Sequence, residues 1–227
     1  MRQLAEDLWV VERPLRFVGV ALGARMTVVR LRDGGLFLHS PVALDDDLRL
    51  ALLALGPPRH AVAPNRFHHR FIGEYQRAFP EVRLYAAPGL AEKRPDLCFD
   101  AELSDAAPET AWAGQIDQAL FAGLPAVNEV VFCHRASRSL LTCDLAFNLG
   151  PEAPLATRLA LRLVGGHGRF GPTLVERWLV RDRAAARSSL AQILAWDFDR
   201  VVVSHGAVLE SGGQTALRDS YRWLARG

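Results

Sequence analysis

The stretch AVAPNRFHHRFIGEY, residues 61–75, decides the architecture that we expect for this chain. A short apolar run at residues 60–63 has the length of a buried strand, and it stops at Pro64. Helical spacing of apolar side chains then continues to about residue 78. The polar loop between strand and helix carries Asn65, Arg66, His68 and His69. Because ligands of α/β proteins collect at the carboxyl ends of strands, this loop is the first candidate for a functional site.

The first quarter of the chain predicts an antiparallel β meander. Residues 26–31, MTVVRL, alternate β-branched and polar side chains, as a half-buried strand does. The sequence Asp33-Gly34-Gly35 predicts a hairpin turn after it, because glycine adopts a positive φ at low cost. The strands predicted for this region are residues 8–11, 17–20, 26–31 and 36–39.

Beyond residue 45 helices and strands alternate, which indicates βαβ units and an α/β fold. Helices are predicted at residues 48–55, up to 78, and at 89–93, 154–164, 173–179, 183–195 and 214–225. Strands are predicted at residues 60–63, 82–86, 116–121, 129–134, 139–142 and 201–203. Residues 100–114 are acidic and rich in alanine, and they predict a connecting loop with one weak strand.

Composition excludes several classes of protein. The 227 residues would fit one α/β domain or two small ones, and we expect a single domain over residues 1–227. The net charge is +2 and the arginines are scattered, so we expect no nucleic-acid partner. Acidic residues interrupt the N-terminus and no apolar run reaches the roughly 20 residues a bilayer requires, so we expect no signal peptide and no membrane partner. Oligomeric state is not indicated.

The cysteines indicate the compartment. Cys98, Cys133 and Cys143 are too few and too widely spaced for a disulfide framework or a cysteine-rich zinc site. Reduced thiols, mostly buried, are what we expect of such a chain, and reduced thiols are typical of the cytoplasm. We therefore predict a cytoplasmic protein.

Three loops that follow predicted strands carry chemically capable side chains: Asn65, His68 and His69 in the first, Asp144 in the second and His205 in the third. In this order the loops resemble the metallo-β-lactamase superfamily, and the resemblance extends over nearly the whole chain. MTVVRLRDGGLFLHSPV is similar to the family's opening hairpin, and VVFCHRASRSLLTCDLAF to the strand pair that presents its bridging aspartate. AWDFDRVVVSHG is similar to its closing strand and final histidine.

This resemblance implies an αββα four-layer sandwich, in which two mixed β-sheets pack face to face with helices outside. It also implies that Asp144 corresponds to the bridging aspartate and His205 to the final histidine ligand. The segment HAVAPNRFHHRFIG stands where the family has its His-x-His-x-Asp-His motif, and it departs from that motif. The protein therefore resembles a divergent branch of the superfamily with a degraded metal motif.

Two registers of this first motif are possible. In one, His69 matches the last histidine of the motif and His68 its aspartate. In the other, His69 matches the aspartate and Arg70 the last histidine. The two leading histidines are replaced in the first register by Pro64 and Arg66, and in the second by Asn65 and Phe67. Both registers lose the leading pair of imidazoles.

The remaining donors suffice for one metal ion. The ligand that normally precedes the bridging aspartate is absent too, since Asn128 is the nearest polar residue in LPAVNEVVF. A catalytic zinc needs about three protein ligands plus water, so we expect one divalent ion at most, zinc, iron or manganese, rather than a two-metal centre. The predicted ligands are His68, His69, Asp144 and His205, with His134 and Asn65 as outside candidates.

The other roles follow from side-chain chemistry. Adjacent residues at a helix start point about 100° apart, so only one of His68 and His69 is expected to face the cleft, and the sequence leaves open which one. We assign predicted catalytic roles to Asp144 and His69. The predicted substrate-binding residues are Asn65, Arg66 and Arg70, because arginine can bind an anion where the family has metal.

Two function classes remain open at this point. The first is an enzyme, a mononuclear metal-dependent hydrolase of undetermined substrate. The second is a metal-free, catalytically inactive protein that keeps the fold for binding or structure, since fold does not dictate function. A hydrolase with a serine or cysteine nucleophile is disfavoured, because no G-x-S-x-G motif is present and we expect Cys143 to be buried.

Overall fold

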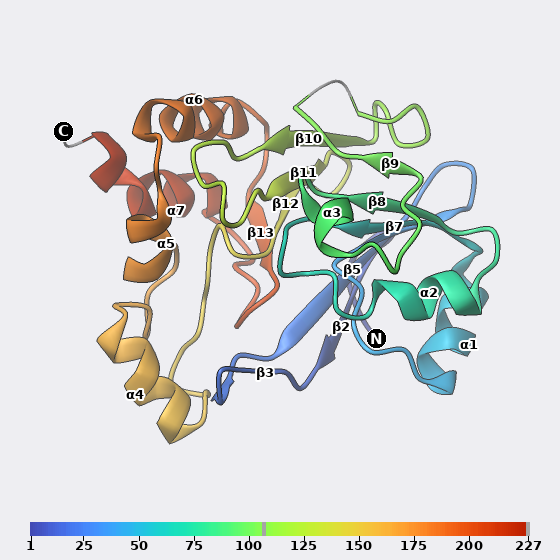
Figure 1. The fold of residues 1–227 in the computed structure, drawn as a ribbon, viewed down its shortest axis with the longest axis horizontal. Helices are drawn as coiled ribbons and strands as arrows, with labels where there is room; N and C mark the ends of the chain where they lie inside the picture. Colours follow the sequence, from blue (N-terminus) through green and yellow to red (C-terminus); the bar gives the residue numbers. More distant parts are fainter. Residues whose placement is uncertain (106–107, 226–227) are drawn as a thin grey trace.

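Two mixed β-sheets pack face to face, and helices cover the outer face of each, in the computed structural model, which describes residues 1–105 and 108–225 (Figure 1). This is the αββα sandwich that the sequence predicts. The first sheet has the strand order β1-β2-β5-β6-β7-β8-β9 and the second the order β10-β11-β12-β13 within the described chain. A small hairpin, β3-β4, stands apart from both sheets.

The first sheet changes from antiparallel to parallel at β6. Strands β1, β2, β5 and β6 are antiparallel neighbours, whereas β6, β7, β8 and β9 run parallel. Its strands are β1 (Arg2–Ala5), β2 (Leu8–Arg13), β5 (Ala24–Arg30), β6 (Leu36–His39), β7 (Pro58–Ala63), β8 (Arg83–Ala86) and β9 (Ala101–Glu102).

The second sheet is antiparallel except at its last pair, where β12 and β13 run parallel. Its strands are β10 (Ile116–Leu120), β11 (Val130–His134), β12 (Ser139–Thr142) and β13 (Arg200–Val203). The separate hairpin comprises β3 (Arg16–Phe17) and β4 (Val20–Ala21).

Helices divide between the two outer faces according to their apolar side chains. Those against the first sheet are α1 (Asp46–Leu55) and α2 (Ile72–Ala78), with the short α3 (Leu90–Lys93) at its edge. Those against the second sheet are α6 (Arg183–Leu194), α7 (Gly213–Ser220) and the 3-10 helix η1 (Arg222–Ala225). Two more, α4 (Leu155–Leu163) and α5 (Leu174–Leu179), lie at one end of the molecule, at the left of Figure 1.

Period-two alternation along the strands explains the layers. In β6, Phe37 points into the core between the sheets, whereas Leu36 and Leu38 point to the core under α1 and α2. In β11, Phe132 points to the shared core and Val131 to the helices beyond. Such strands carry no polar face because both of their faces are covered.

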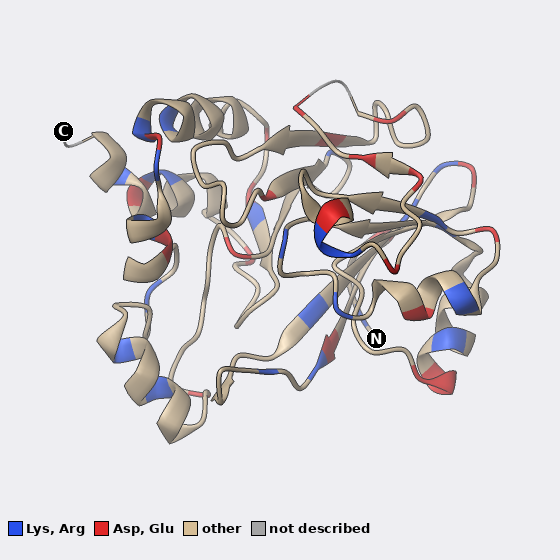
Figure 2. Cartoon of the chain, viewed as in Figure 1, with Lys and Arg blue, Asp and Glu red and all other residues tan. Residues whose placement is uncertain are grey.

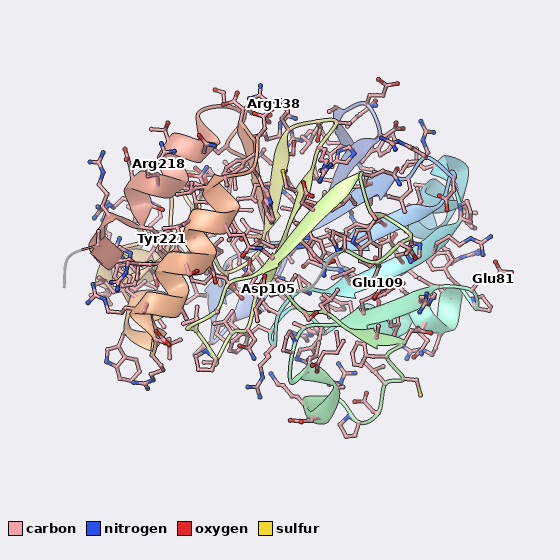
Figure 3. All side chains as sticks on the ribbon, turned by 90° about the horizontal axis from the view of Figure 1, so that it is seen from above. Glu81, Asp105, Glu109, Arg138, Arg218 and Tyr221 are labelled. Atoms are coloured by element: carbon pink, nitrogen blue, oxygen red, sulfur yellow. The ribbon has the colours of Figure 1, made fainter. Side chains whose placement is uncertain are left out.

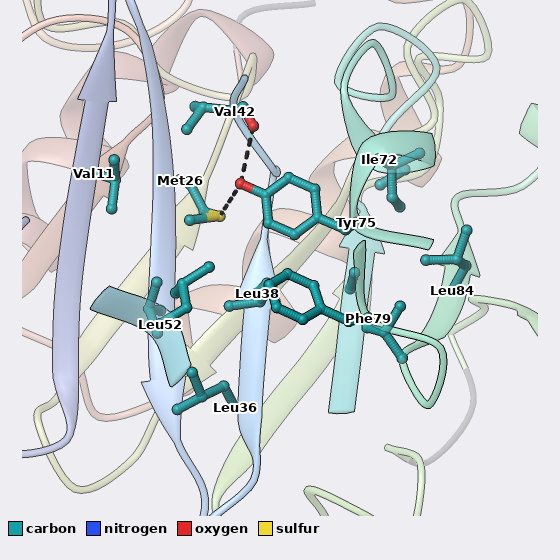
Figure 4. Close-up of a cluster of buried hydrophobic side chains, with 14 of the residues drawn as sticks. Val11, Met26, Leu36, Leu38, Val42, Leu52, Ile72, Tyr75, Phe79 and Leu84 are labelled. Atoms are coloured by element: carbon teal, nitrogen blue, oxygen red, sulfur yellow. Dashed lines mark hydrogen bonds between the residues drawn. The ribbon is translucent and has the colours of Figure 1, made fainter. Parts of the chain in front are cut away.

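The outer core of the first sheet anchors the helix that follows the first candidate loop. Tyr75 of α2 is fully buried, and its hydroxyl donates a hydrogen bond of 2.9 Å to the carbonyl of Val42 (Figure 4). The same hydroxyl lies 3.4 Å from the sulfur of Met26. A buried phenol with a satisfied hydroxyl contributes apolar area without an unpaired polar group. It therefore holds α2, and with it the end of the loop, in one position.

The outer core of the second sheet anchors the second candidate loop, which carries Asp144. Tyr221, labelled in Figure 3 among the helices at the left, is buried next to Phe121, with ring centroids 5.5 Å apart. Its hydroxyl donates to the carbonyl of Leu145 at 2.8 Å. Leu145 directly follows Asp144, so this bond connects the helical layer to the second candidate loop.

Most predicted elements are present, but the strand predicted at residues 17–20 is wrong. Val18 and Gly19 form a turn with φ of 47° and 80°, so this region is the β3-β4 hairpin. The loop predicted at 100–114 contains β9, and its residues 106–107 lie outside the described chain. Among the described helices, none combines the length and the apolar character needed to cross a bilayer.

Candidate metal centre

Three loops meet at one edge of the two sheets because β7, β12 and β13 present their carboxyl ends there. Asn65, Asp144 and His205 each lie two residues beyond the end of their strand. Strands β12 and β13 are parallel neighbours, so the loops after them emerge side by side. The two sheets thereby bring together residues that are far apart in sequence, as expected for a site at the carboxyl ends of strands.

His68, Asp144 and His205 form a compact group of metal-binding side chains. One donor atom from each lies within 4.8 Å of the donors of the other two. The Nε2 atoms of His68 and His205 are 3.2 Å apart. The Oδ1 atom of Asp144 lies 3.5 Å from Nε2 of His68 and 3.6 Å from Nε2 of His205. Three of the four predicted ligands are thus within reach of a common point.

Hydrogen bonds on the outer side of each imidazole fix the ring orientations. Nδ1 of His205 lies 2.7 Å from the carbonyl oxygen of Gly23, which can only accept, so this nitrogen carries the proton. Nε2 of a neutral His205 then offers a lone pair to the centre of the group. Nδ1 of His68 lies 2.7 Å from Oγ of Ser40, a hydroxyl that can donate or accept. Phe147 stacks on the His205 ring at 5.5 Å and 10°, which restricts its rotation.

A buried carboxylate positions Asp144. Glu129, next to the start of β11, is almost completely buried. Its Oε2 accepts the backbone N–H groups of Asp144 at 2.6 Å and Leu145 at 3.0 Å, while its Oε1 accepts the N–H of Cys143 at 2.7 Å and the Thr142 hydroxyl at 2.5 Å. A carboxylate that accepts so many donors holds the turn after β12 in one conformation.

Asn65 links this network to the ligand itself. Its Nδ2 donates to Oδ2 of Asp144 at 2.8 Å and to Oε2 of Glu129 at 3.2 Å. Its Oδ1 accepts the backbone N–H groups of Phe67 at 2.8 Å and His68 at 2.9 Å. The amide therefore orients the Asp144 carboxylate with Oδ1 toward the histidines, and it shapes the loop that carries His68.

The Asp144 carboxylate and the neighbouring imidazoles shift one another's pKa values. Burial alone would lower the pKa of His68, but the neighbouring Cys143 and Asp144 outweigh it and raise this pKa well above its ordinary value. Burial alone would raise the pKa of Asp144, but His68 and His205 hold it well below its usual range. Burial and the Asp144 carboxylate raise the pKa of Glu129. Asp144 is therefore an anion with two imidazoles beside it.

The structure does not bring His69 into this group. Its Nδ1 lies 2.9 Å from Nη1 of Arg94, on the opposite side of the loop from His68. Burial, followed by the charges of Lys93 and Arg94, lowers the pKa of His69 to about 4. A ring committed to a guanidinium is an unfavourable metal ligand, so the geometry assigns His69 neither the ligand role nor the catalytic role predicted for it.

The predicted substrate-binding residues separate in the structure. Asn65 is fully buried and bonded within the group, so it acts as a positioning residue for Asp144. Arg66 lies at the edge of the loop, with Nη1 3.3 Å from the carbonyl of Pro125. Arg70 is exposed and lies over the ring of Phe71 at 5.4 Å.

The outside candidate His134 and the nearby polar residue Asn128 also lie away from the group of His68, Asp144 and His205. His134 ends β11 at the opposite end of the strand from Glu129, where its Nδ1 lies 2.8 Å from the Ser137 hydroxyl. Asn128 donates to the carbonyl of Pro88 at 3.1 Å and has a positive φ of 48°, so it shapes a turn. The sequence analysis named Asn128 but not the adjacent Glu129, whose carboxylate holds the turn after β12.

Sequence reasoning also missed Ser40 and Gly23. A charged residue at the entry to the apolar strand VVFCH was a signal for Glu129, because an acid rarely enters a buried strand without a partner. Ser40 follows a strand end in the same way as the predicted ligands, and its φ of 57° is unusual for a residue other than glycine. Gly23 contributes only a backbone carbonyl, for which no side-chain pattern exists.

The donor set suits one divalent ion. Two imidazole nitrogens and one carboxylate oxygen are the ligands of a three-residue catalytic zinc site, and they also suit iron or manganese. The Gly23 carbonyl on Nδ1 of His205 is the kind of outer hydrogen bond that orients histidine ligands. Cys143 adds no thiolate, because burial raises its pKa, and the Ser204 hydroxyl donates to its sulfur at 3.0 Å. The residues present therefore fit a mononuclear centre.

Solved structures with this fold cover nearly the whole chain. A metallo-β-lactamase from Pontibacter korlensis matches with a TM-score of 0.64 at 13% identity, over 99% of this chain and 98% of its own. One from Erythrobacter litoralis matches with a TM-score of 0.66 at 16% identity, over 99% and 95%. The mono-zinc form of FIM-1 from Pseudomonas aeruginosa matches with a TM-score of 0.65 at 13% identity, over 99% and 94%. Identities this low establish the fold alone.

Sequence comparison gives the family. No curated protein matches the sequence of this chain. The family model described as domain of unknown function DUF4336 matches residues 5–164, which is more than half of the chain and includes Asn65, His68 and Asp144. His205 lies beyond the matched segment, in the part that the solved structures cover. The chain belongs to the DUF4336 family, and its fold is the one seen in metallo-β-lactamases.

Proposed function

We propose that this protein is a mononuclear metal-dependent hydrolase, with His68, Asp144 and His205 as the ligands of one divalent ion. The observation that carries the proposal is the convergence of Nε2, Oδ1 and Nε2 from these residues within 4.8 Å of one another. A divalent ion with an open coordination position supplies Lewis acidity and lowers the pKa of water toward neutrality. Zinc, iron and manganese are the candidates.

The protein's own residues contribute orientation and charge. Asp144 supplies a negative charge whose direction is set by Asn65 and by the backbone that Glu129 holds. The Ser40 hydroxyl can accept a hydrogen bond from Nδ1–H of His68 as readily as donate one, so His68 can present an unprotonated Nε2 to an ion. The carbonyl of Gly23 keeps His205 in the matching tautomer. A site whose ligands are oriented in advance loses less free energy on binding.

Relatives of known structure support the metal proposal through their fold. One of them was solved in a mono-zinc form, which is the stoichiometry we propose here. The substrate class does not follow from this likeness. The three cysteines are free, in agreement with the proposed cytoplasmic location.

A metal-free binding or structural protein is the competing function, and one observation favours it. The Nε2 atoms of His68 and His205 are close enough to hydrogen-bond directly, and Asp144 accepts from Asn65, so the group can satisfy itself with a proton in the centre. In that case the same network would serve to hold the three loops together.

Metal content and thermal stability distinguish the two functions. Protein purified without added metal is analysed for zinc, iron and manganese, and its Tm is measured with and without an excess of each ion. A bound ion should raise the Tm by roughly 5–10 °C at a hundredfold excess over Kd, because only the folded state binds it. The zinc-loaded protein should also hydrolyse a panel of chromogenic esters, and His205→Ala should remove both effects.

The alternative predicts a different result. Sub-stoichiometric metal together with a Tm that no added ion changes would reject the hydrolase and leave the metal-free function. His69→Ala is the matched control for His205→Ala, because it removes an imidazole from the same end of the molecule without touching the proposed ligands.

A further inference from the structure

Helix α4 exposes a continuous stripe of leucines. Leu155, Leu159 and Leu163 follow one another at intervals of four residues, so they lie along one face of the helix. Leu155 is 65% exposed and Leu163 is 84% exposed. The opposite face carries Thr157 and Leu161, which are buried against the rest of the molecule. The leucine stripe is therefore separate from the face of α4 that packs against the rest of the molecule.

Helix α5 continues this apolar surface. Leu174, Val175 and Trp178 are all exposed, and the indole of Trp178 is 71% exposed. The N–H of Leu174 donates to the carbonyl of Val164 at 2.8 Å, so the start of α5 abuts the end of α4. We call the surface formed by Leu155, Leu159, Leu163, Leu174, Val175 and Trp178 the α4–α5 face. A contiguous exposed apolar surface of this kind marks an interaction site.

Arginines outnumber acidic residues around the α4–α5 face, which Glu152 and Asp182 flank. Between residues 154 and 181 the sequence has five arginines, Arg158, Arg162, Arg169, Arg177 and Arg181. The one acidic residue of this segment, Glu176, is committed to the N-cap of α5, where its carboxylate accepts the N–H of Thr173 at 2.9 Å. Figure 2 shows these basic segments along α4 and between α5 and α6, at the same end of the molecule.

The excess of arginines favours an anionic partner over a second copy of the chain. In a symmetric dimer each arginine of the face would approach the arginines of the second copy, because a twofold interface places the same surface on both sides. An anionic lipid surface complements the arginines and accepts leucine and tryptophan side chains into its apolar boundary. We propose that the α4–α5 face docks the protein on the surface of an anionic lipid bilayer.

Docking of this kind needs no spanning segment. The helices would lie in the plane of the interface, with the leucines and Trp178 directed into the lipid and the arginines extended toward the headgroups. The prediction of no membrane partner rested on the lack of a spanning segment. That argument does not apply to docking on the bilayer surface.

Vesicle flotation tests the proposal. The full chain is mixed with vesicles of phosphatidylcholine alone or of phosphatidylcholine with phosphatidylglycerol. We expect binding to the anionic vesicles and at least about tenfold weaker binding to the neutral ones. Leu159→Gln with Leu163→Gln, and separately Arg162→Glu with Arg181→Glu, should each lower anionic binding by about tenfold or more.

A matched control comes from the opposite end of the molecule. Leu50 and Leu53 of α1 are also exposed leucines, but Asp46 and Asp47 accompany them. Leu50→Gln with Leu53→Gln should leave vesicle binding unchanged. Circular dichroism and Tm of each variant establish that it is folded, and light scattering after gel filtration gives the mass in solution.

Three results would overturn the proposal. The first is no binding to anionic vesicles by the folded wild-type chain. The second is binding that the α4–α5 variants leave intact. The third is a wild-type dimer that Leu159→Gln with Leu163→Gln converts to a monomer, since a second copy would then occupy the face.

Discussion

The loop after β7 and the loops after β12 and β13 reach the same point by different means. The later loops each supply a ligand directly from the position two residues beyond the strand, Asp144 and His205. The earlier loop has Asn65 at that position, and its ligand, His68, follows three residues later. In the proposed metal centre, the earlier loop lacks the leading imidazoles of the motif and would contribute one ring, His68, and the Asn65 amide that orients Asp144.

Glu129 and Asn65 are what connects the two kinds of loop. Glu129 sits at the entry of β11 and holds the backbone after β12, while Asn65 joins both carboxylates. Two acids this close would repel each other without such donors. The ligands of the later loops are thus supported by a residue of the earlier one, and substitutions at the two regions should not be independent.

The largest expected effect separates the two adjacent histidines of the earlier loop. His68→Ala should lower the affinity for zinc by more than about 100-fold, the upper end of the loss caused by removing a residue that only orients a ligand. His69→Ala should change the affinity by less than about threefold, because its ring is bonded to Arg94 outside the group. Competition with a chromophoric chelator measures both. A large loss of zinc affinity in His69→Ala, with little loss in His68→Ala, would make His69 the ligand instead of His68.

Glu129→Gln should produce the largest loss of stability among the conservative variants at this centre. The new amide group would direct N–H donors at the backbone N–H groups that Glu129 now accepts, so about 2–3 kcal/mol of unfolding free energy should be lost. Urea unfolding of the metal-free protein measures this loss. Glu92→Gln on the exposed face of α3 is the control and should be neutral. A neutral Glu129→Gln would contradict the positioning role.

Asn65→Ala should weaken metal binding by roughly 10–100-fold, because Asp144 would lose the donor that orients it. Ser40→Ala should have a similar but smaller effect through His68. Both variants should keep a stoichiometry of one ion, which isothermal titration calorimetry measures together with Kd. Loss of the stoichiometry itself in Asn65→Ala would make the amide a ligand rather than a positioning residue.

Near neutral pH the smallest expected effect is a pH dependence from His39, in the strand that pairs with β7. His39 ends β6, is fully buried, and has a pKa lowered to about 3, chiefly by burial and then by His68. Below pH 6.5 the unfolded chain takes up a proton that the folded chain does not. Stability should therefore fall as the pH drops from about 6.5 toward 3, by at most about 1.4 kcal/mol per pH unit from this residue.

His39→Gln removes the titrating group and tests this contribution. Unfolding free energies from urea titrations at several pH values should show a shallower slope for the variant than for the wild type. Identical slopes would mean that His39 is accessible to protons in the folded state.

Strand alternation and the glycine and proline turn signals predicted most elements, whereas the αββα arrangement was predicted from the resemblance to the metallo-β-lactamase superfamily. The error at residues 17–20 arose because Val18 adopts a positive φ of 47°, which its β-branched side chain disfavours and which only tertiary structure imposes. Asp144 and His205 could be predicted because they follow strand ends in a recognisable pattern. His68 and His69 could not be separated, because which ring faces inward depends on Ser40 and Arg94, both distant in sequence.

The most direct test of the mononuclear centre is the number of ions bound per chain. Native mass spectrometry after equilibration with zinc should show one ion per wild-type chain, one per His69→Ala chain, and none for His68→Ala, Asp144→Ala or His205→Ala. Two ions per wild-type chain, or none, would contradict a centre built from His68, Asp144 and His205.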